Sequence, residues 1–489
     1  MTFIRRCVSA AAALTAITGI AIAAAPASSG AGLTAPLGVT AAGPAKPYDF
    51  NGDGYQDLAT GGPSGTVGTV QGAGYVSVVY GSGSGLNTAK RQVISQDSPG
   101  VPGGPEAGDE FGWTLASADF DSDGYADLAV SAPSEKLDVS NAGLVSVIFG
   151  SASGLSSSVT ALSIPAGQQG ADDYFGDLMA AGDFNRDGRP ELVASAEGKR
   201  SYFTYSFRAS RAAVPGSVAK APQNRFMDIA ADDVDGDGYA DLATVTNDYD
   251  YSSSNNVSVF RGGTGGLATS PAATVKASAW SGLSWLALGD VNGDKRADVI
   301  LGDNYAYVNG IDAAGRVVAY YGGADSISAS RSTVINQDSA GVAGGPEADD
   351  FFGFAVATGD INNDGFADVA VGVLGESIGS VTSAGMATVL YGTPSGLSGT
   401  GSQSFSQNET VGTPEQDDEM GSAVTLLDFN NDGQDDLGIG VRGENTHDGG
   451  AQALKAVDGK ITGTGALSFL GSDVGANTTD AWLGLTIGH

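Results

Sequence analysis

The most constraining feature of this sequence is a nine-residue acidic segment that recurs seven times. The first copy runs from Asp49 to Asp57, and every copy fits the pattern D-x-[DN]-x-D-x-x-x-[DE]. The remaining copies begin at Asp119, Asp183, Asp233, Asp290, Asp360 and Asp428. The average interval is about 63 residues, which is a period typical of arrays built from one supersecondary unit per repeat.

Each copy places oxygen-bearing side chains at positions 1, 3, 5 and 9, and six copies have glycine at position 6. Carboxylates and amide carbonyls are hard ligands that suit Ca²⁺, and the backbone carbonyl at position 7 can add another oxygen. We therefore predict up to seven calcium sites, although a solvated Asp/Gly turn is the alternative for any single copy. The candidate ligands, taken from positions 1, 3, 5, 7 and 9, are Asp49, Asn51, Asp53, Tyr55, Asp57, Asp119, Asp121, Asp123, Tyr125, Asp127, Asp183, Asn185, Asp187, Arg189, Glu191, Asp233, Asp235, Asp237, Tyr239, Asp241, Asp290, Asn292, Asp294, Arg296, Asp298, Asp360, Asn362, Asp364, Phe366, Asp368, Asp428, Asn430, Asp432, Gln434 and Asp436.

The helical EF-hand is excluded as the source of these loops. An EF-hand loop needs a bidentate glutamate at position 12, where this chain has Thr60, Val130 or Val371. An apolar, strand-like stretch follows each loop instead of a helix. Without a metal the carboxylates would repel one another, so calcium is expected to be needed for rigidity.

The segments between the loops predict short strands. An aromatic-glycine pair precedes several loops, as at Phe111-Gly112, and an apolar run ending near Gly or Pro follows, as at residues 127–133. A third stretch alternates clearly over residues 74–81, and a fourth covers residues 91–95. Four short strands per repeat without helical periodicity predict an all-β, seven-bladed β-propeller.

At these residues the chain resembles the FG-GAP repeat of integrin α-subunit propellers and of many secreted bacterial proteins. The likeness rests on the aromatic-glycine pair, the acidic loop and the Ala132-Pro133 type of ending, and it covers about residues 48–489. The resemblance implies a calcium-binding propeller that contacts its partner through the rim opposite the calcium loops. Such propellers serve unrelated functions, so the resemblance implies no particular activity.

The two ends of the repeat region predict a closed ring. No aromatic-glycine pair precedes the loop at Asp49, whereas residues 480–489 resemble the start of the sixth repeat at residues 350–357. We expect residues 480–489 to supply the missing first strand of the first blade. This pairing would protect both sheet edges.

The amino terminus predicts export. Arg5 and Arg6 precede an apolar run that ends in small residues, which is typical of a cleaved signal peptide over residues 1–27. A membrane anchor is the alternative, and both the general and the twin-arginine export routes are compatible with this segment. Residues 28–47 predict a flexible leader, and Cys7 would leave with the signal, so a secreted, extracellular protein without disulfides is expected.

The net negative charge of the chain limits the classes of partner that it can bind. The chain has 23 Lys+Arg and 56 Asp+Glu residues and a formal net charge of −33. Such a surface should repel nucleic acid and anionic membranes. No later apolar stretch is long enough to span a membrane.

The longer loops predict where a partner binds. They fall on the rim opposite the acidic loops, and two of them, residues 96–106 and 337–347, are nearly identical. Common repeat ancestry and a shared ligand both account for this similarity. We expect an extracellular binding or adhesion module for a protein or glycan.

The alternative function is a secreted hydrolase or polysaccharide lyase acting on extracellular carbohydrate or ester. One G-x-S-x-G segment contains Ser377, and His447 lies in the corresponding loop of the next repeat, which would allow a Ser–His pair. A nucleophile elbow, however, is a turn from a strand into a helix, and no helix is expected here. A pair of acidic catalytic residues cannot be selected among 56 acids, and an acidic polysaccharide would meet few bases. The catalytic residues, if any exist, are therefore unknown from the sequence.

Overall fold

The computed structural model describes residues 45–221, 225–247, 255–277, 284–476 and 481–488. All of them belong to one unit, residues 42–489. The predicted signal peptide, most of the predicted leader, and Cys7 lie outside the described residues. The last leader residues contact the folded unit, since the Ala45 N–H donates to Asp119 at 3.2 Å.

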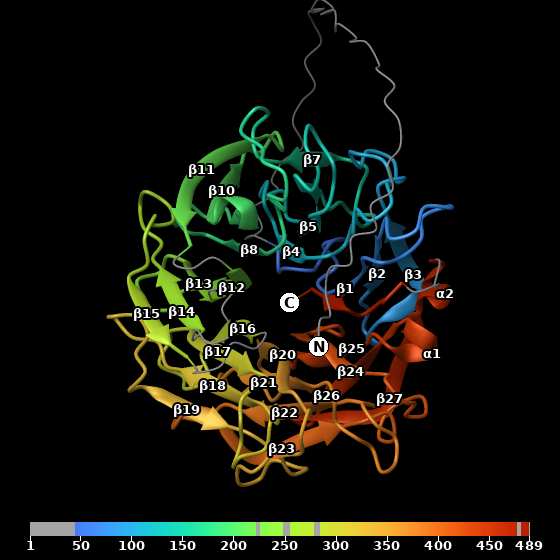
Figure 1. Ribbon diagram of the computed structural model, residues 1–489, viewed down its shortest axis with the longest axis vertical. Helices are drawn as coiled ribbons and strands as arrows, with labels where there is room; N and C mark the ends of the chain where they lie inside the picture. The colour runs from blue at the N-terminus through green and yellow to red at the C-terminus, as the bar shows by residue number, and fades with distance from the viewer. Residues whose placement is uncertain (1–44, 222–224, 248–254, 278–283, 477–480, 489) are drawn as a thin grey trace, which may run out of the picture. The chain divides into compact units, whose positions relative to one another are not determined.

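The strands form seven antiparallel four-stranded sheets that follow one another around a ring (Figure 1). From the innermost to the outermost strand, the sheets are as follows: β28 (Thr486–Ile487), β1 (Leu58–Gly62), β2 (Tyr75–Tyr80) and β3 (Asn87–Ile94); β4 (Leu115–Ala118), β5 (Asp127–Ala132), β6 (Leu144–Ile148) and β7 (Val159–Leu162); β8 (Met179–Gly182), β9 (Glu191–Ala196), β10 (Ser201–Phe207) and β11 (Ala213–Lys220); β12 (Arg225–Asp232), β13 (Asp241–Asn247), β14 (Asn256–Phe260) and β15 (Ala273–Lys276); β16 (Ser284–Gly289), β17 (Asp298–Asp303), β18 (Arg316–Tyr320) and β19 (Ser332–Ile335); β20 (Phe352–Gly359), β21 (Asp368–Val373), β22 (Met386–Tyr391) and β23 (Ser398–Phe405); and β24 (Met420–Leu427), β25 (Asp436–Val441), β26 (Gly450–Val457) and β27 (Lys460–Leu470). We call them sheets one to seven in this order. The seven-bladed β-propeller predicted from the repeats is confirmed.

Burial explains the different sequence patterns of the strands. The second strand of each sheet, such as β5 or β21, is buried along its whole length and therefore reads as a continuous apolar or small-residue run. The outermost strand is partly exposed, as β3 and β7 show, and its pattern is correspondingly irregular. The apolar clusters lie between neighbouring sheets, so each sheet is covered on both faces. Among the described residues, helix is limited to the short segments η1 (Glu197–Lys199), α1 (Glu444–His447) and α2 (Gly471–Val474).

The carboxyl-terminal strand closes the ring, as predicted. β28 pairs with β1, with Thr60 opposite Ile487. Leu483 forms the same bridge to the preceding sheet that Phe352 and Met420 form in theirs. Asp480 and His489, which belong to the predicted closing segment, lie outside the described residues.

The glycine of the aromatic-glycine pair is required by close backbone approach. Gly353 of such a pair and the equivalent Gly484, which follows Leu483, have φ values of 89° and 85°. A Cβ on Gly484 would lie 2.2 Å from the carbonyl oxygen of Gly450, and one on Gly353 would lie 2.7 Å from that of Arg316. A larger residue would therefore separate neighbouring sheets, which explains the sequence signal.

The antiparallel topology separates the loops into two rims. The acidic loops connect the first and second strands, and they share a rim with the turns between the third and fourth strands. We call this the loop rim. The turns between second and third strands and the links between sheets lie on the opposite rim, which we call the link rim. Within the part of the chain that the structure describes, no helix is long and apolar enough to cross a membrane.

Candidate metal centres

All seven acidic loops share one hydrogen-bonded frame around the aspartate at position 1. One carboxylate oxygen accepts the N–H of position 5, and the other accepts the N–H of position 6. In the loop at Asp119 these bonds, from Asp123 and Gly124, are both 3.0 Å long. The same pair occurs in the other six loops. The position 1 carboxylate therefore fixes the shape of its own loop.

The carboxylate at position 5 is also used locally in every loop. It accepts the N–H of position 7, at 3.1 Å between Tyr125 and Asp123. The matching bonds in the other loops measure between 3.0 and 3.2 Å. Each of these two carboxylates is thus oriented by backbone donors.

Two positions in each loop have positive φ. At position 6, which is glycine in six copies, φ lies between 85° and 91° at the glycines and is 67° at Lys295. Position 4 has positive φ as well, including at Ser122 and Arg186, with values of 58° and 57°. The requirement at position 4 was not visible in the sequence, because glycine, serine, arginine and asparagine all occupy it.

The carboxylate at position 9 faces inward and is buried. Asp127 accepts the N–H of Phe120 and the N–H of Gly150, each at 2.9 Å. It thereby ties the loop to the end of the third strand of its sheet. Burial, with the neighbouring carboxylates, raises the pKa of Asp127 to about 8. Equivalent residues show the same direction, with Asp57 at about 8 and Glu191, Asp241, Asp298, Asp368 and Asp436 at about 7.

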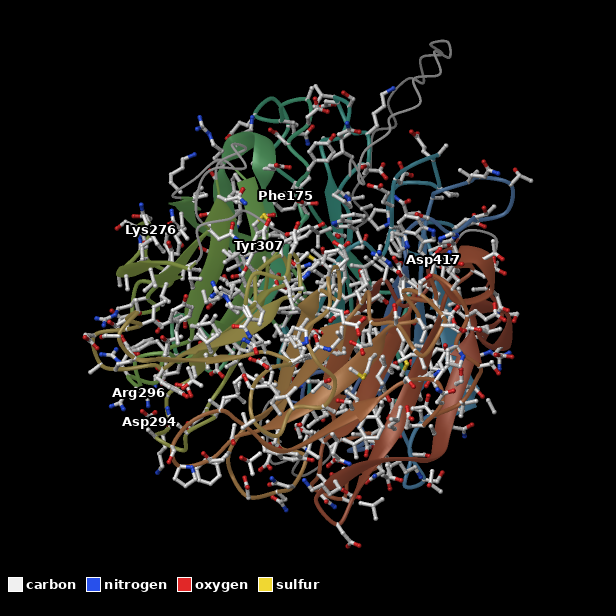
Figure 2. The ribbon with its side chains drawn as sticks, turned by 60° about the horizontal axis from the view of Figure 1, so that its bottom comes forward. Phe175, Lys276, Asp294, Arg296, Tyr307 and Asp417 are labelled. Carbon is white, nitrogen blue, oxygen red and sulfur yellow. The ribbon has the colours of Figure 1, made fainter. Side chains whose placement is uncertain are left out.

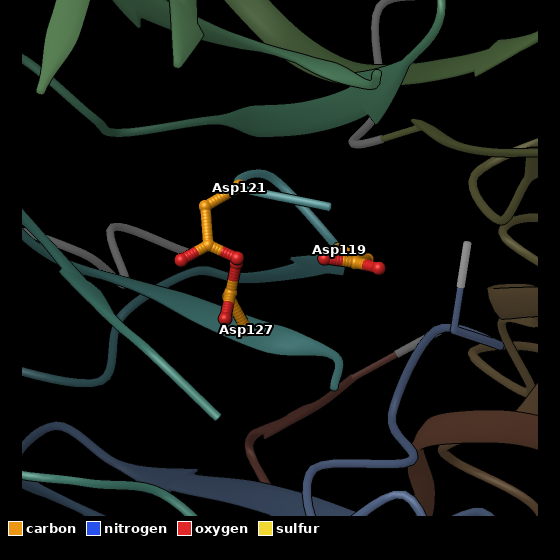
Figure 3. Close-up of side chains that lie close together, drawn as sticks. All are labelled: Asp119, Asp121 and Asp127. Atoms are coloured by element: carbon orange, nitrogen blue, oxygen red, sulfur yellow. The ribbon is translucent and has the colours of Figure 1, made fainter. Parts of the chain in front are cut away.

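In two loops, three carboxylates come within reach of a single ion. They are Asp119, Asp121 and Asp127 in the second sheet, and Asp233, Asp235 and Asp237 in the fourth. Figure 3 shows the carboxylates of Asp121 and Asp127 turned toward each other, with Asp119 beside them. These are the two loops that carry aspartate rather than asparagine at position 3.

An arginine pairs with the additional carboxylate in both of these loops. Arg211 contacts Asp121 at 2.7 Å, and Arg261 contacts Asp235 at 2.8 Å. Both arginines lie in turns between the third and fourth strands. Sequence reasoning missed them because nothing near them in the chain marks their partners.

The remaining loops use asparagine at position 3. The Asn185 and Asn430 side chains donate to the position 9 carboxylates of their loops, Glu191 and Asp436. Their Oδ1 atoms are buried and accept no hydrogen bond from the described residues. A buried amide oxygen beside several carboxylates, with oxygen donors only, is a donor set that fits Ca²⁺.

Neighbouring loops are hydrogen-bonded around the loop rim. The N–H at position 8 donates to the position 1 carbonyl of the preceding loop, for example from Ala126 to Asp49 at 3.0 Å. The seventh and first loops are joined in the same way, from Gln56 to Asp428 at 3.2 Å. At the junction between the second and third sheets, position 8 is Pro190, which has no N–H to donate. The loops therefore form one connected rim rather than seven separate turns.

The residues considered for ester hydrolysis are not joined in the described structure. Ser377 follows β21 in a turn, and no helix begins there. The His447 ring lies beside Trp482, with ring centroids 6.2 Å apart. Among the described residues, no hydrogen bond connects Ser377 with His447.

Comparisons with known proteins agree with this architecture. The FG-GAP repeat model matches residues 47–79, 111–148 and 352–390, and the FG-GAP-like repeat model matches residues 233–301. Phosphatidylinositol-glycan-specific phospholipase D of Bos taurus is 36% identical over 150 residues, which make up 30% of this chain and 17% of that protein. Integrin alpha-6 of Gallus gallus is 33% identical over 92 residues, or 19% of this chain and 7% of that protein.

A solved structure is also similar at low sequence identity. It is a mutant of AofleA from Arthrobotrys oligospora, with a TM-score of 0.39 and 11% identity, and the likeness covers 73% of this chain and 88% of that one. The chain spans at most about 17% of the length of the curated relatives named above. From the matched segments and the seven sheets, we conclude that this chain is a seven-bladed β-propeller that contains FG-GAP repeats and is homologous in part to integrin alpha-6 and phosphatidylinositol-glycan-specific phospholipase D.

Proposed function

We propose that this protein is a secreted, calcium-dependent binding module. Its acidic loops would hold Ca²⁺ on the loop rim, and its link rim would contact an extracellular protein or glycan. The observation that supports this most directly is the shared frame of the seven loops, in which every position 1 and position 5 carboxylate is oriented by backbone N–H groups. Seven copies of one orienting frame are more than a solvated turn requires.

Calcium would act here as a structural ion. The residues that would hold it are the side chains at positions 1, 3, 5 and 9 of each loop, with the position 7 carbonyl. A bound cation would offset the repulsion among carboxylates that burial brings together at positions such as Asp127. Because the loops are joined around the rim, ordering one loop would also support its neighbours.

The link rim is favoured as the binding face by its exposed apolar side chains. Tyr305 and Tyr307 lie in the turn after β17 and are 40% and 48% exposed, and Val411 in the link before β24 is 40% exposed. Tyr305 packs on Phe351 of the next link, with centroids 5.1 Å apart. Figure 2 shows Tyr307 and Asp417, of the link rim, well apart from Asp294 and Arg296 of an acidic loop. Exposed tyrosines held by a neighbouring ring are suited to protein and glycan contacts.

The hydrolase or lyase alternative stays a prediction. The similarity to a phospholipase D covers 17% of that protein, so the activity in its name is not carried over to this chain. A binding module therefore agrees better with the described side chains.

The test is binding of the mature protein to a glycan array and to candidate extracellular proteins, in 1 mM CaCl₂ and in EDTA. We expect binding in calcium, loss of binding in EDTA, and recovery when calcium is restored. Binding that is equal in both buffers would contradict a calcium-dependent module. Turnover of an ester or polysaccharide substrate would favour the alternative.

A pair of variants tests the binding face. Tyr305→Ser with Tyr307→Ser should weaken binding at least about tenfold, because tyrosines frequently dominate such contacts. The matched control is Val334→Ser on the outer strand β19, where Val334 is 48% exposed. Equal weakening by both changes, or by neither, would exclude the link rim as the contact surface.

A further inference from the structure

Three links carry the same group of polar side chains at the same place. Each link contributes a glutamine and an aspartate, and the turn between the second and third strands of the sheet that it enters contributes a glutamate. These link clusters are Gln96, Asp109 and Glu135; Gln337, Asp350 and Glu376; and Gln407, Asp418 and Glu444. Two of them include the near-identical segments noted in the sequence.

The internal contacts of the clusters repeat. The glutamine Nε2 donates to the glutamate at 2.5, 2.7 and 2.7 Å in the second, sixth and seventh sheets. The aspartate accepts the N–H of the residue three positions earlier, at 2.6 Å in all three. The aspartates are 1–2% exposed and the glutamines 3–4% exposed. These are therefore built sites rather than acidic surface patches.

One atom of each cluster has no partner. The glutamine Oε1 is buried and accepts no hydrogen bond from any described residue at Gln96, Gln337 or Gln407. A buried amide oxygen without a donor is costly, and here the cost occurs three times at equivalent positions. A 180° rotation of the glutamine amide group would exchange its Oε1 and Nε2 atoms, so that the oxygen instead of the nitrogen would point toward the glutamate.

The clusters also lack a positive partner. Among the described residues, no ion pair involves any of the six carboxylates. The nearest arginine in the chain to Glu444 is Arg442, which pairs with Glu419. Burial, followed by the nearby acids, raises the pKa of Asp109 to about 7 and that of Asp418 to about 6. In each cluster the aspartate and the glutamate repel each other electrostatically, and a bound cation would offset this repulsion.

The third sheet holds a natural variant of the same arrangement. Asp173 is buried and accepts the N–H of Gly170 at 2.5 Å, as Asp109 accepts that of Glu106. Lys199 stands three residues after the end of the second strand, where Glu135 stands in its sheet. Its Nζ lies 3.3 Å from Asp173.

The glutamine is replaced in the same sheet. Ile164 follows Ser163 as Gln96 follows Ser95. Where a lysine supplies the positive charge, the glutamate is missing and the glutamine is absent from its usual position; a different glutamine of this link, Gln169, donates to the Ile164 carbonyl at 2.9 Å and has a buried Oε1 without a donor among the described residues. The aspartate thus has a cation partner in this sheet, whereas in the other three sheets no described lysine or arginine forms an ion pair with it.

We propose that each link cluster is a second kind of calcium site, on the rim opposite the acidic loops. Its ligands are the aspartate, the glutamate and the glutamine Oε1, and the ion takes the charge role that Lys199 has in the third sheet. Oxygen-only donors with two carboxylates favour Ca²⁺, which accepts irregular geometry more readily than Mg²⁺ does. The sites join a link to the sheet that it enters, so an ion there would fasten the link rim.

The test is the number of Ca²⁺ ions bound by the full mature protein, measured by equilibrium dialysis. The triple variant Glu135→Gln, Glu376→Gln, Glu444→Gln keeps an acceptor for each glutamine and removes one charge per cluster. We expect it to bind about three ions fewer than the parent protein, and each single variant about one fewer. The same number of ions in the folded triple variant would overturn the proposal.

A second variant, which should bind an additional ion, tests the proposal even if the triple variant folds poorly. Ile164→Gln with Lys199→Glu rebuilds the cluster in the third sheet and should add about one ion. No added ion in the folded protein would overturn the proposal. Asp123→Asn in an acidic loop is the control: if it changes nothing while the link variants lose ions, the loop sites fail and the link sites stand.

Discussion

The two rims hold carboxylates in different ways. On the loop rim, both oxygens of Asp119 accept N–H groups from within their own nine-residue segment. On the link rim, Asp109 accepts one local N–H, and its other neighbours, Gln96 and Glu135, come from segments brought together by the fold. The first arrangement is local and repeats seven times. The second depends on tertiary structure and is found only where the link supplies the glutamine and the aspartate and the turn supplies the glutamate.

The largest expected effect is calcium removal, which tests whether the loop rim dominates stability. At ~1 mM Ca²⁺ and a Kd of ~0.1 mM, each loop would add about 1.4 kcal/mol, so that seven would add about 10. The melting temperature should fall by more than about ten degrees in EDTA. In the link-cluster triple variant, EDTA should still lower the melting temperature by most of this amount, because the loop sites are intact. An unchanged melting temperature of the parent protein in EDTA would contradict a structural role for calcium.

The next effect concerns the strand β28, which closes the ring of sheets and so holds both rims together. Removing residues 482–489 eliminates the buried Leu483 and Ile487 and exposes the edge of β1. Burial of two such side chains contributes about 3–6 kcal/mol, so the shortened protein should aggregate or become sensitive to protease. Limited proteolysis measures this effect, and removal of His489 alone is the control. Normal melting after the longer deletion would show that the ring does not need its last strand.

A smaller effect separates structural from metal-binding carboxylates within one loop. Asp127→Ala leaves the N–H groups of Phe120 and Gly150 without acceptors and should cost about 2–5 kcal/mol even in EDTA. Asp123→Ala removes an exposed carboxylate and should cost less than about 1 kcal/mol in EDTA, while weakening calcium binding. Chemical denaturation with and without calcium distinguishes the two, and equal costs in EDTA would show that position 9 has no separate structural role.

The smallest expected effect concerns the relative calcium affinities of the acidic loops. Lys295 holds position 6 with φ of 67°, where the other loops have glycine, and its charge lies beside the expected ion. Lys295→Gly should tighten the weakest calcium-binding step about tenfold, which corresponds to ~1.4 kcal/mol. Gly365→Lys is the matched reversal, because a Cβ there meets no atom within 4 Å and only the backbone angle and charge change. Calorimetric titration with calcium measures both changes. If neither variant alters the binding isotherm, the loop that contains Lys295 is not the weakest calcium site.

Local physics made much of the fold readable from the sequence. The acidic loop has its own hydrogen bonds, so its residues recur at fixed spacing, and buried second strands such as β5 must be apolar along their whole length. The closing strand was predictable because Gly484 meets the same backbone contact as Gly353, which only glycine permits. The requirement for positive φ at position 4 could not be predicted, since Ser122 and Arg186 accept that angle beside glycines elsewhere.

The sequence by itself determined the number of sheets, their order and the positions of the loop carboxylates, because each of these depends on interactions within about one repeat. Only the tertiary structure decided which charges meet. It brings Arg211 to Asp121 across 90 residues, Gln96 to Glu135 across 39, and Lys199 to Asp173 from separate segments. The reason is physical: the spacing of residues along the chain can show that a side chain recurs, but which side chains meet is set by how neighbouring segments and sheets pack.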